Sequence, residues 1–220
     1  MAEKITIVEN ILKKNNTIAQ ENRELFDKIG MFAINLMASP GAGKTSLIEI
    51  SLKNLSGKYN IAVVDGDIAT SIDADRAAAF GATAVQINTG GECHLDANML
   101  SQSLSFVTKV HHDLLFVENV GNLICPASFQ LGTHKSVLIA SIPEGDDKPY
   151  KYPSIYCGVD ALVINKIDLL PYVNFRMDYF IEGVKILNPG LITFPLSCTS
   201  NEGISEWIKW LDTQILDMKE

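Results

Sequence analysis

The sequence has little of what a membrane-spanning, secreted or nucleic-acid-binding protein needs. No apolar run approaches the roughly 18 residues required to cross a bilayer, and residues 1–16 mix charges with apolar positions, unlike a signal peptide. The four cysteines are too scattered for a secreted disulfide framework. A formal net charge of −8 does not suit a general binder of phosphate backbones. We therefore expect a cytoplasmic protein with reduced thiols that binds neither membrane nor nucleic acid.

Length and composition indicate one folded domain preceded by a short extension. The 220 residues are 47% hydrophobic and 20% charged, which is enough apolar material for one substantial core. Residues 1–29 place apolar side chains at spacings that largely suit an amphipathic helix, and Gly30 is a suitable stop. We expect an N-terminal helical extension over residues 1–30 and a single domain over residues 31–220.

Short apolar runs alternate with helix-period stretches from Met31 onward. The predicted strands are residues 31–37, 60–64, 83–87, 114–118, 136–141, 160–164 and 191–196, and the predicted helices include 46–55, 95–110, 173–187 and 204–218. Near-continuous apolarity indicates strands covered on both faces. The alternation predicts an α/β fold with a doubly wound, mostly parallel sheet of about seven strands. Residues 143–158 lack a clear period and are expected to be a functional loop.

A glycine-rich motif follows the first predicted strand. Residues 38–45 read ASPGAGKT and open a helical run, as in a phosphate-binding P-loop. Its glycines let backbone N–H groups surround phosphate oxygens, while Lys44 reaches the β/γ-phosphates and Thr45 ligates Mg²⁺. The predicted phosphate-binding residues are Gly41, Ala42, Gly43, Lys44, Thr45 and Ser46, with Lys44 also catalytic. Ala38 replaces the first glycine of the usual pattern, and the alternative is a glycine-rich turn that binds nothing.

A second motif, Asn165-Lys166-Ile167-Asp168, predicts which nucleotide base the protein binds, and it follows an apolar strand. In an NKxD motif the aspartate accepts the N1–H and 2-amino hydrogens of guanine, whereas adenine presents the opposite donor pattern. The predicted base-binding residues are therefore Asn165, Lys166 and Asp168, joined by Ser197 and Cys198 after the seventh strand. The alternatives are ordinary strand-to-helix turns, with Asp168 capping the next helix.

Acidic residues at the ends of two further strands predict the magnesium site. Asp67 follows the second strand and Glu118 ends the fourth, so both lie at the carboxyl edge where ligands bind in this architecture. We expect both to act in catalysis and, with Thr45, around Mg²⁺, and Gly121 to approach a γ-phosphate. Asp73 and Asp75 are weaker candidates, because an acidic helix start needs no metal. No glutamine or arginine finger is identifiable from the sequence, which favours slow turnover.

Six segments together resemble the HypB family of metal-insertion GTPases. They are SPGAGKT, VVDGDIAT, NTGGECHLDA, ENVGNLICPASFQLGTHK, PEGDDKPYKYP and NKIDL, within residues 30–203. The resemblance implies a GTPase that dimerises when GTP is bound and helps deliver nickel to the hydrogenase large subunit, together with a nickel-handling accessory protein. A urease-type GTPase is the runner-up, because Ala127 stands where that family has histidine after Cys-Pro. A small-molecule kinase is disfavoured by NKxD.

The same resemblance implies a metal site for Ni²⁺ or Zn²⁺ at the dimer interface, built from Cys93, His94 and Cys125. Thiolate and imidazole suit both metals. Cys93 and His94 are adjacent and are expected to point in different directions, so that one chain supplies an incomplete shell. The remaining histidines and cysteines are expected to be structural or surface residues; they are His111, His112, His134, Cys157 and Cys198. Lys148 or Lys151 is a candidate for reaching the partner's nucleotide.

Overall fold

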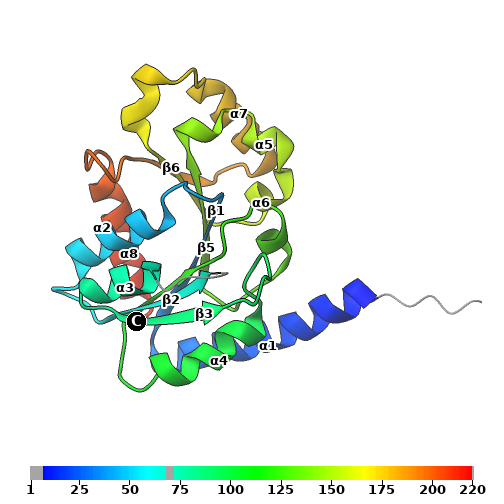
Figure 1. Cartoon of the computed structure of the whole chain (residues 1–220), viewed down its shortest axis with the longest axis vertical. Coiled ribbons are helices and arrows are strands. Elements are labelled where there is room, and N and C mark those ends of the chain that lie inside the picture. Colours follow the sequence, from blue (N-terminus) through cyan, green and yellow to red (C-terminus); the bar gives the residue numbers. More distant parts are fainter. Residues whose placement is uncertain (1–6, 68–71, 220) are drawn as a thin grey trace, which may run out of the picture.

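The computed structural model describes residues 7–67 and 72–219 and has a seven-stranded parallel sheet at its centre (Figure 1). The strands are β1 (Phe32–Ala38), β2 (Ile61–Asp67), β3 (Thr83–Asn88), β4 (Leu114–Glu118), β5 (Lys135–Ser141), β6 (Ala161–Asn165) and β7 (Ile192–Pro195). Their order is β3-β2-β4-β1-β5-β6-β7, and every neighbouring pair is parallel. The predicted fold class and all seven predicted strands are confirmed.

Helices cover both faces of the sheet, as the apolar strands require. The longer ones are α1 (Ile7–Ile29), α2 (Lys44–Leu55), α3 (Ile72–Ala79), α4 (Ala97–Val107), α7 (Met177–Leu187) and α8 (Ile204–Asp217). The short ones are α5 (Lys148–Lys151), α6 (Pro153–Cys157) and the 3-10 turns η1 (Cys125–Ser128), η2 (Ile142–Glu144) and η3 (Ile167–Tyr172). Residues 143–158, predicted as a loop, therefore contain short helices.

Alternation along β1 shows how the two faces differ. Phe32, Ile34 and Leu36 pack with residues of α2 and α8 in one apolar cluster. Ala33, between them, belongs to a second cluster with residues of α1 and α4 on the opposite face. Since side chains of a strand point alternately to its two faces, a strand between two helical layers is mostly apolar on both faces. All seven residues of β1 are buried, and Asn35 is the polar one among them.

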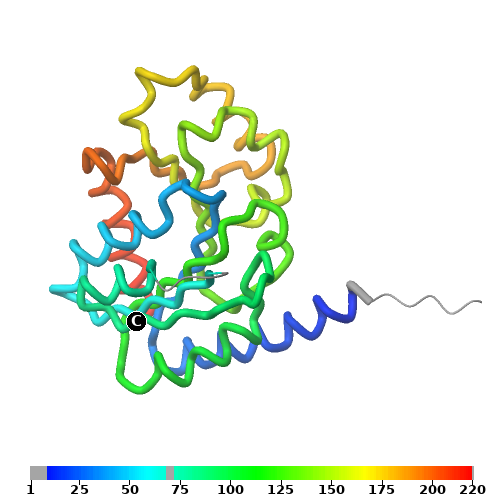
Figure 2. Tube along the Cα trace, in the orientation of Figure 1, coloured from blue at the N-terminus to red at the C-terminus, as the bar shows by residue number. Residues whose placement is uncertain are grey.

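Helix α1 packs beside α4, and its N-terminal end extends past the sheet (Figure 2). The predicted helix over residues 1–29 is confirmed from Ile7 to Ile29, and residues 1–6 lie outside the described part of the chain. Phe26 is buried in the cluster beneath α4. Asn22, also buried, donates hydrogen bonds to the carbonyls of Ala97 and Leu131, at 2.9 and 3.0 Å. Within residues 7–67 and 72–219, no helix is long and apolar enough to cross a membrane.

His134 joins α1 to the sheet and is a structural residue, as predicted. Its Nδ1 accepts the N–H of Ala33 at 2.9 Å, and its Nε2 lies 2.8 Å from Oδ1 of Asp27 in α1. The ring stacks on Phe32, with centroids 5.4 Å apart. Burial lowers the pKa of His134 below its usual value, and the charge of Arg23 also lowers it. Together these two effects outweigh Asp27, which raises the pKa. The neutral ring is the form that fits, because Nδ1 must keep its lone pair for Ala33.

The first prediction concerns acid stability. Because the folded pKa of His134 is lowered, its stabilising contribution is complete above the unfolded pKa of about 6.5 and is lost as pH falls below it. We expect His134→Ala to cost about 1–3 kcal/mol in urea unfolding near pH 7.5, from lost buried hydrogen bonds, and clearly less near pH 5.5. His111→Ala, at an exposed histidine, is the control. A cost that does not depend on pH would contradict this role.

Candidate functional site

The P-loop closes over the end of β1 because two of its glycines adopt conformations that other residues avoid. Gly41 and Gly43 have φ values of +76° and +107°, and α2 begins directly afterwards at Lys44. A Cβ on Gly43 would lie 2.3 Å from Nδ2 of Asn165, so this position has no room for a side chain. Ala42, also predicted to bind phosphate, is buried and contributes backbone. The loop therefore presents its amides and the first turn of α2 to an anion.

Asn165 and Lys166 of the NKxD motif hold the P-loop in place. The carboxamide of Asn165 donates to the carbonyl of Ala42 at 2.9 Å, and Nζ of Lys166 donates to the carbonyl of Gly41 at 2.7 Å. Oδ1 of Asn165 also accepts the backbone N–H of Cys198 at 3.3 Å. Both residues line the pocket. Their hydrogen bonds to P-loop carbonyls show that they also position the P-loop, which the sequence alone did not indicate.

Asp168 and Cys198, two of the predicted base-binding residues, lie near each other at one end of the site. Oδ1 of Asp168 is buried and has no hydrogen-bond partner in the described part of the chain. Cys198 lines the pocket, and burial, followed by the charge of Asp168, raises the pKa of its thiol to about 11, so the thiol is neutral. Ser197 instead stabilises its own loop, accepting the N–H groups of Thr199 and Ser200 at 3.1 and 3.0 Å. An unpaired buried acceptor is costly unless a ligand supplies the donor.

Two buried carboxylates lie at the other end of the pocket, on neighbouring strands. Asp65 of β2 pairs in register with Glu118 of β4. The pKa of each is raised to about 7, mainly by burial; the charge of Asp73 contributes to both shifts, and Lys44 opposes them. Thr45 donates its hydroxyl to Oε1 of Glu118 at 2.8 Å, and Oδ2 of Asp65 has no hydrogen-bond partner within the described residues. Buried acids of this kind gain most from a cation.

The cavity encloses about 520 Å³ and brings most predicted residues together. Those on its walls include Gly41, Gly43, Lys44, Thr45, Ser46, Asp67, Asp73, Glu118, Gly121, Asn165, Lys166 and Cys198. Ala42, Asp75, Asp168 and Ser197 are not among the lining residues. Gly121 packs against Pro40 of the P-loop, where a Cβ would lie 3.0 Å from backbone atoms. The segment after β4 is thus held directly over the P-loop.

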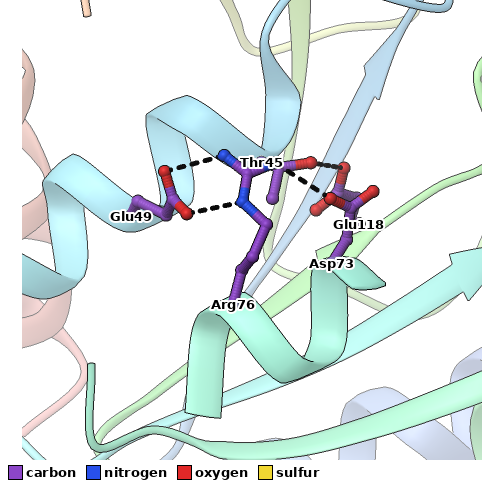
Figure 3. Close-up of polar contacts among 5 residues, drawn as sticks. All are labelled: Thr45, Glu49, Asp73, Arg76 and Glu118. Atoms are coloured by element: carbon purple, nitrogen blue, oxygen red, sulfur yellow. Dashed lines mark hydrogen bonds and ion pairs between the residues drawn. The ribbon is translucent and has the colours of Figure 1, made fainter. Parts of the chain in front are cut away.

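Sequence reasoning missed Asp65 and Arg76. Asp65 is a charged residue inside an apolar strand, a signal that was available in the sequence but was attached to Asp67, two residues later. Arg76 also lines the pocket and pairs with Glu49 and Asp73 (Figure 3). No arginine near the phosphate site was identifiable from the sequence, and the fold brings Arg76 there. An ion pair between α2 and α3 depends on how two helices pack, so residue spacing could not reveal it.

The three predicted ligands of the second metal site lie together within one chain. The ligand atoms of Cys93, His94 and Cys125 are all within 4.8 Å of one another, and no other such group of three is found among residues 7–67 and 72–219. The two sulfur atoms are 2.7 Å apart, and Sγ of Cys93 is 3.7 Å from Nδ1 of His94. The expectation that Cys93 and His94 point apart is wrong, because both lie in the turn before α4 and not on the helix.

Two features of this trio suit a soft or borderline metal ion. Burial lowers the pKa of His94, so the imidazole is neutral and can donate a lone pair. Its ring packs against Phe129 at a tilt, with the ring centroids 4.0 Å apart. The bond to Cys125, and then burial, raises the pKa of Cys93, so the metal-free Cys93 thiol keeps its proton. Two thiols and one imidazole are a donor set for Ni²⁺ or Zn²⁺.

Two asparagines connect the segment after β4 to the turn that carries Cys93. Oδ1 of Asn119, next to Glu118, accepts the N–H of Leu95 at 3.0 Å. Asn122 donates to the carbonyl of Cys93 at 3.2 Å and accepts the N–H of Ile124 at 2.9 Å. The trio is therefore anchored to the strand end that contributes the buried Glu118.

The fold and the pocket define a P-loop nucleoside triphosphatase, and known proteins give its family. Residues 32–194 match the family described as CobW/HypB/UreG, nucleotide-binding domain. The hydrogenase maturation factor HypB of Azotobacter vinelandii is 43% identical over 96% of this chain and 69% of its own length. The probable hydrogenase maturation factor HypB of Methanocaldococcus jannaschii is 41% identical over 98% of this chain and 97% of its own length.

A solved structure agrees with this assignment. The crystal structure of HypB from Helicobacter pylori in complex with nickel has a TM-score of 0.88 and 36% identity, covering 93% of this chain and 96% of that one. This chain belongs to the HypB family of hydrogenase maturation factors.

Proposed function

We propose that this chain is a GTP-hydrolysing metallochaperone that assists nickel insertion into the large subunit of a hydrogenase, together with a nickel-handling accessory protein. The observation that carries the proposal is the link between two sites: residues 118–125 run from the buried carboxylate of the nucleotide pocket to a thiol of the Cys/His trio. The family supports nickel as the cargo, since the Helicobacter pylori relative was crystallised with that metal.

Guanine is the base that suits the pocket. Asp168 has a buried oxygen without a partner, and guanine offers N–H donors at N1 and the 2-amino group. Adenine has an acceptor at N1, which would face the carboxylate unfavourably. The neutral Cys198 thiol adds no second charge at this end. GTP is therefore the proposed nucleotide.

The other end of the pocket suits Mg²⁺ and the terminal phosphates. Thr45, Asp67 and Glu118 supply oxygen ligands of the kind that Mg²⁺ prefers, directly or through water. When bound there, Mg²⁺ would neutralise charge on the β- and γ-phosphates. Lys44 neutralises the same oxygens from the first turn of α2, and the backbone amides of the P-loop orient them. Hydrolysis gives GDP and phosphate.

The second prediction tests the nucleotide and the reaction together. Purified protein with Mg²⁺ should release phosphate from GTP and not from ATP, and Lys44→Ala should abolish release. Asp168→Asn should weaken GTP binding by at least about tenfold, the usual effect of leaving donors unpaired, while xanthosine triphosphate, with an oxygen at position 2, binds the amide better. Phosphate transfer to a metabolite would indicate a kinase, and binding without release an interaction module. Equal GTP affinity of the variant would refute the base assignment.

The metal site is proposed to lie at a two-fold interface. Three ligands from one chain leave room for a fourth, and a two-fold axis would bring a second trio to the same place. Because Asn119 and Asn122 anchor the Cys93 turn to the segment after β4, a shift of Gly121 on γ-phosphate binding would change the spacing of the ligands. Nucleotide state would then bias metal capture or release, which is linkage between two sites.

The third prediction addresses that linkage. Cys93→Ala and Cys125→Ala should each abolish stoichiometric Ni²⁺ or Zn²⁺ binding and leave GTP affinity nearly unchanged. Cys157→Ala is the matched control, because that thiol is exposed and outside the trio. Metal affinity in the wild type, measured against a chelator, should differ between the GDP state and a state with a non-hydrolysable GTP analogue. Identical affinities in both states would refute coupling.

The fourth prediction concerns assembly. We expect the GTP analogue with Mg²⁺ to produce a symmetric dimer in light scattering, while apo and GDP forms stay monomeric. Lys151 is ion-paired with Asp147, whereas Lys148 lies over the ring of Tyr152, 5.4 Å from its centroid. Lys148 is thus the cation that we expect to reach the partner's nucleotide, and Lys148→Ala should prevent dimerisation. Lys185→Ala, on α7, is the control. One mass in all three nucleotide states would refute nucleotide-driven assembly.

A further inference from the structure

Arg76 is a cation on the wall of the nucleotide pocket, and the mechanism proposed above gives it no role. It lies on α3, and its guanidinium reaches toward α2 between two carboxylates (Figure 3). Nε and Nη2 donate to the two oxygens of Glu49 at 2.7 and 2.9 Å, and Nη1 donates to Asp73 at 3.1 Å. Three of its five N–H groups are used in these bonds. Arginine is always charged, so the cation is permanently present.

The two carboxylates connect Arg76 to the phosphate end of the pocket. Glu49 is four residues after Thr45 on α2, so it lies one turn along the same side of the helix. Asp73 lines the same pocket as Thr45 and Glu118, and its side chain lies beside that of Glu118 (Figure 3). Arg76 therefore lies beside the proposed magnesium and γ-phosphate site, held by Asp73 on the pocket wall and by Glu49 one turn further along α2.

The pair with Glu49 is of a kind that a phosphate can replace. The side chains of Arg76 and Glu49 are 43% and 23% exposed, and ion pairs with this much solvent contribute little net stability. A guanidinium binds phosphate in the same forked geometry that it uses for a carboxylate. The γ-phosphate of GTP carries more negative charge than one glutamate, so it competes well for the same N–H groups.

Resting on the proposed GTPase function, we propose that Arg76 is a catalytic arginine supplied in cis, and that Glu49 withholds it until GTP binds. During hydrolysis the water oxygen bonds to the γ-phosphorus, and the bond to the β–γ bridging oxygen breaks with its electron pair leaving on GDP. One water proton goes to solvent and the other stays on phosphate. Arg76 transfers no proton; it neutralises charge on the oxygens in the transition state. Because Glu49 competes with the γ-phosphate for the same N–H groups, it determines the fraction of time in which Arg76 can contact the phosphate.

A purely structural role for the pair makes the opposite prediction for Glu49. If Arg76 and Glu49 only fasten α3 to α2, removing either partner loosens the same contact, and both variants should lower activity together. If Glu49 withholds a catalytic cation, Glu49→Gln should raise activity while Arg76→Ala lowers it. The glutamine keeps the size of the side chain and removes its charge.

The fifth prediction is tested by single-turnover GTP hydrolysis, which is independent of product release. Arg76→Ala should slow the step by on the order of 10- to 100-fold with GDP affinity unchanged, and Arg76→Lys should recover part of the rate. Glu49→Gln should be several-fold faster than the wild type, and the double variant should be as slow as Arg76→Ala. Lys58→Ala, which removes an ion pair with Asp212 beyond the far end of α2, should match the wild type.

The outcomes separate this inference from the proposed function. If the wild type does not hydrolyse GTP, the proposed function fails first. If the wild type hydrolyses GTP and Arg76→Ala does so equally well, the arginine assignment alone is refuted. Slower hydrolysis by both Arg76→Ala and Glu49→Gln, with lowered thermal unfolding midpoints, would identify the pair as a structural fastening and overturn the proposal.

Discussion

The carboxamide of Asn165 is the interaction on which the nucleotide site depends. It donates to the P-loop carbonyl of Ala42 and accepts N–H groups from Lys166 and Cys198, so one buried side chain joins three loops from the ends of three strands. The P-loop can approach it only because Gly43 has no Cβ. A parallel sheet brings strand ends to one edge but does not fix the loops that follow. Here a single residue holds the P-loop to the loops that follow β6 and β7.

The same edge concentrates negative charge that the metal-free, nucleotide-free protein must tolerate. Asp65 and Glu118 are buried on adjacent strands, and their raised pKa values show that the fold holds them against the preference of carboxylates for water. The neighbouring cations compensate incompletely, since Lys44 opposes both shifts without cancelling them. Arg76 adds a second cation nearby, paired with Glu49 on α2. The proposed Mg²⁺ and nucleoside triphosphate would suit such a site together, because each balances the charge that the other brings.

Much of this molecule could be predicted from its sequence, and the exceptions share a physical cause. Strand positions followed from continuous apolar runs, since a strand between two helical layers has no polar face. The pocket residues after β1, β4 and β6 followed from motifs whose spacing encodes a local turn. Arg76 and the holding role of Asn165 did not follow, because each depends on contacts between elements far apart in the chain. The direction of His94 was predicted wrongly because the sequence does not show how the turn before α4 bends the chain and brings the two neighbouring side chains together.

Asparagine recurs wherever two functional segments of this protein meet, and its chemistry explains why. Asn119 bonds the N–H groups of Leu95 and Val120 and donates to Asn35, so the end of β4 is held to both β1 and the turn before α4. Asn122 then holds the carbonyl of Cys93. A carboxamide donates and accepts at once without a charge, so it can be buried between loops where a carboxylate or an amine would need a counter-ion. Each such bond keeps its partners at one distance. Under the proposed coupling, movement of the segment over the P-loop would be transmitted to the cysteine turn through the bonds of Asn119 and Asn122.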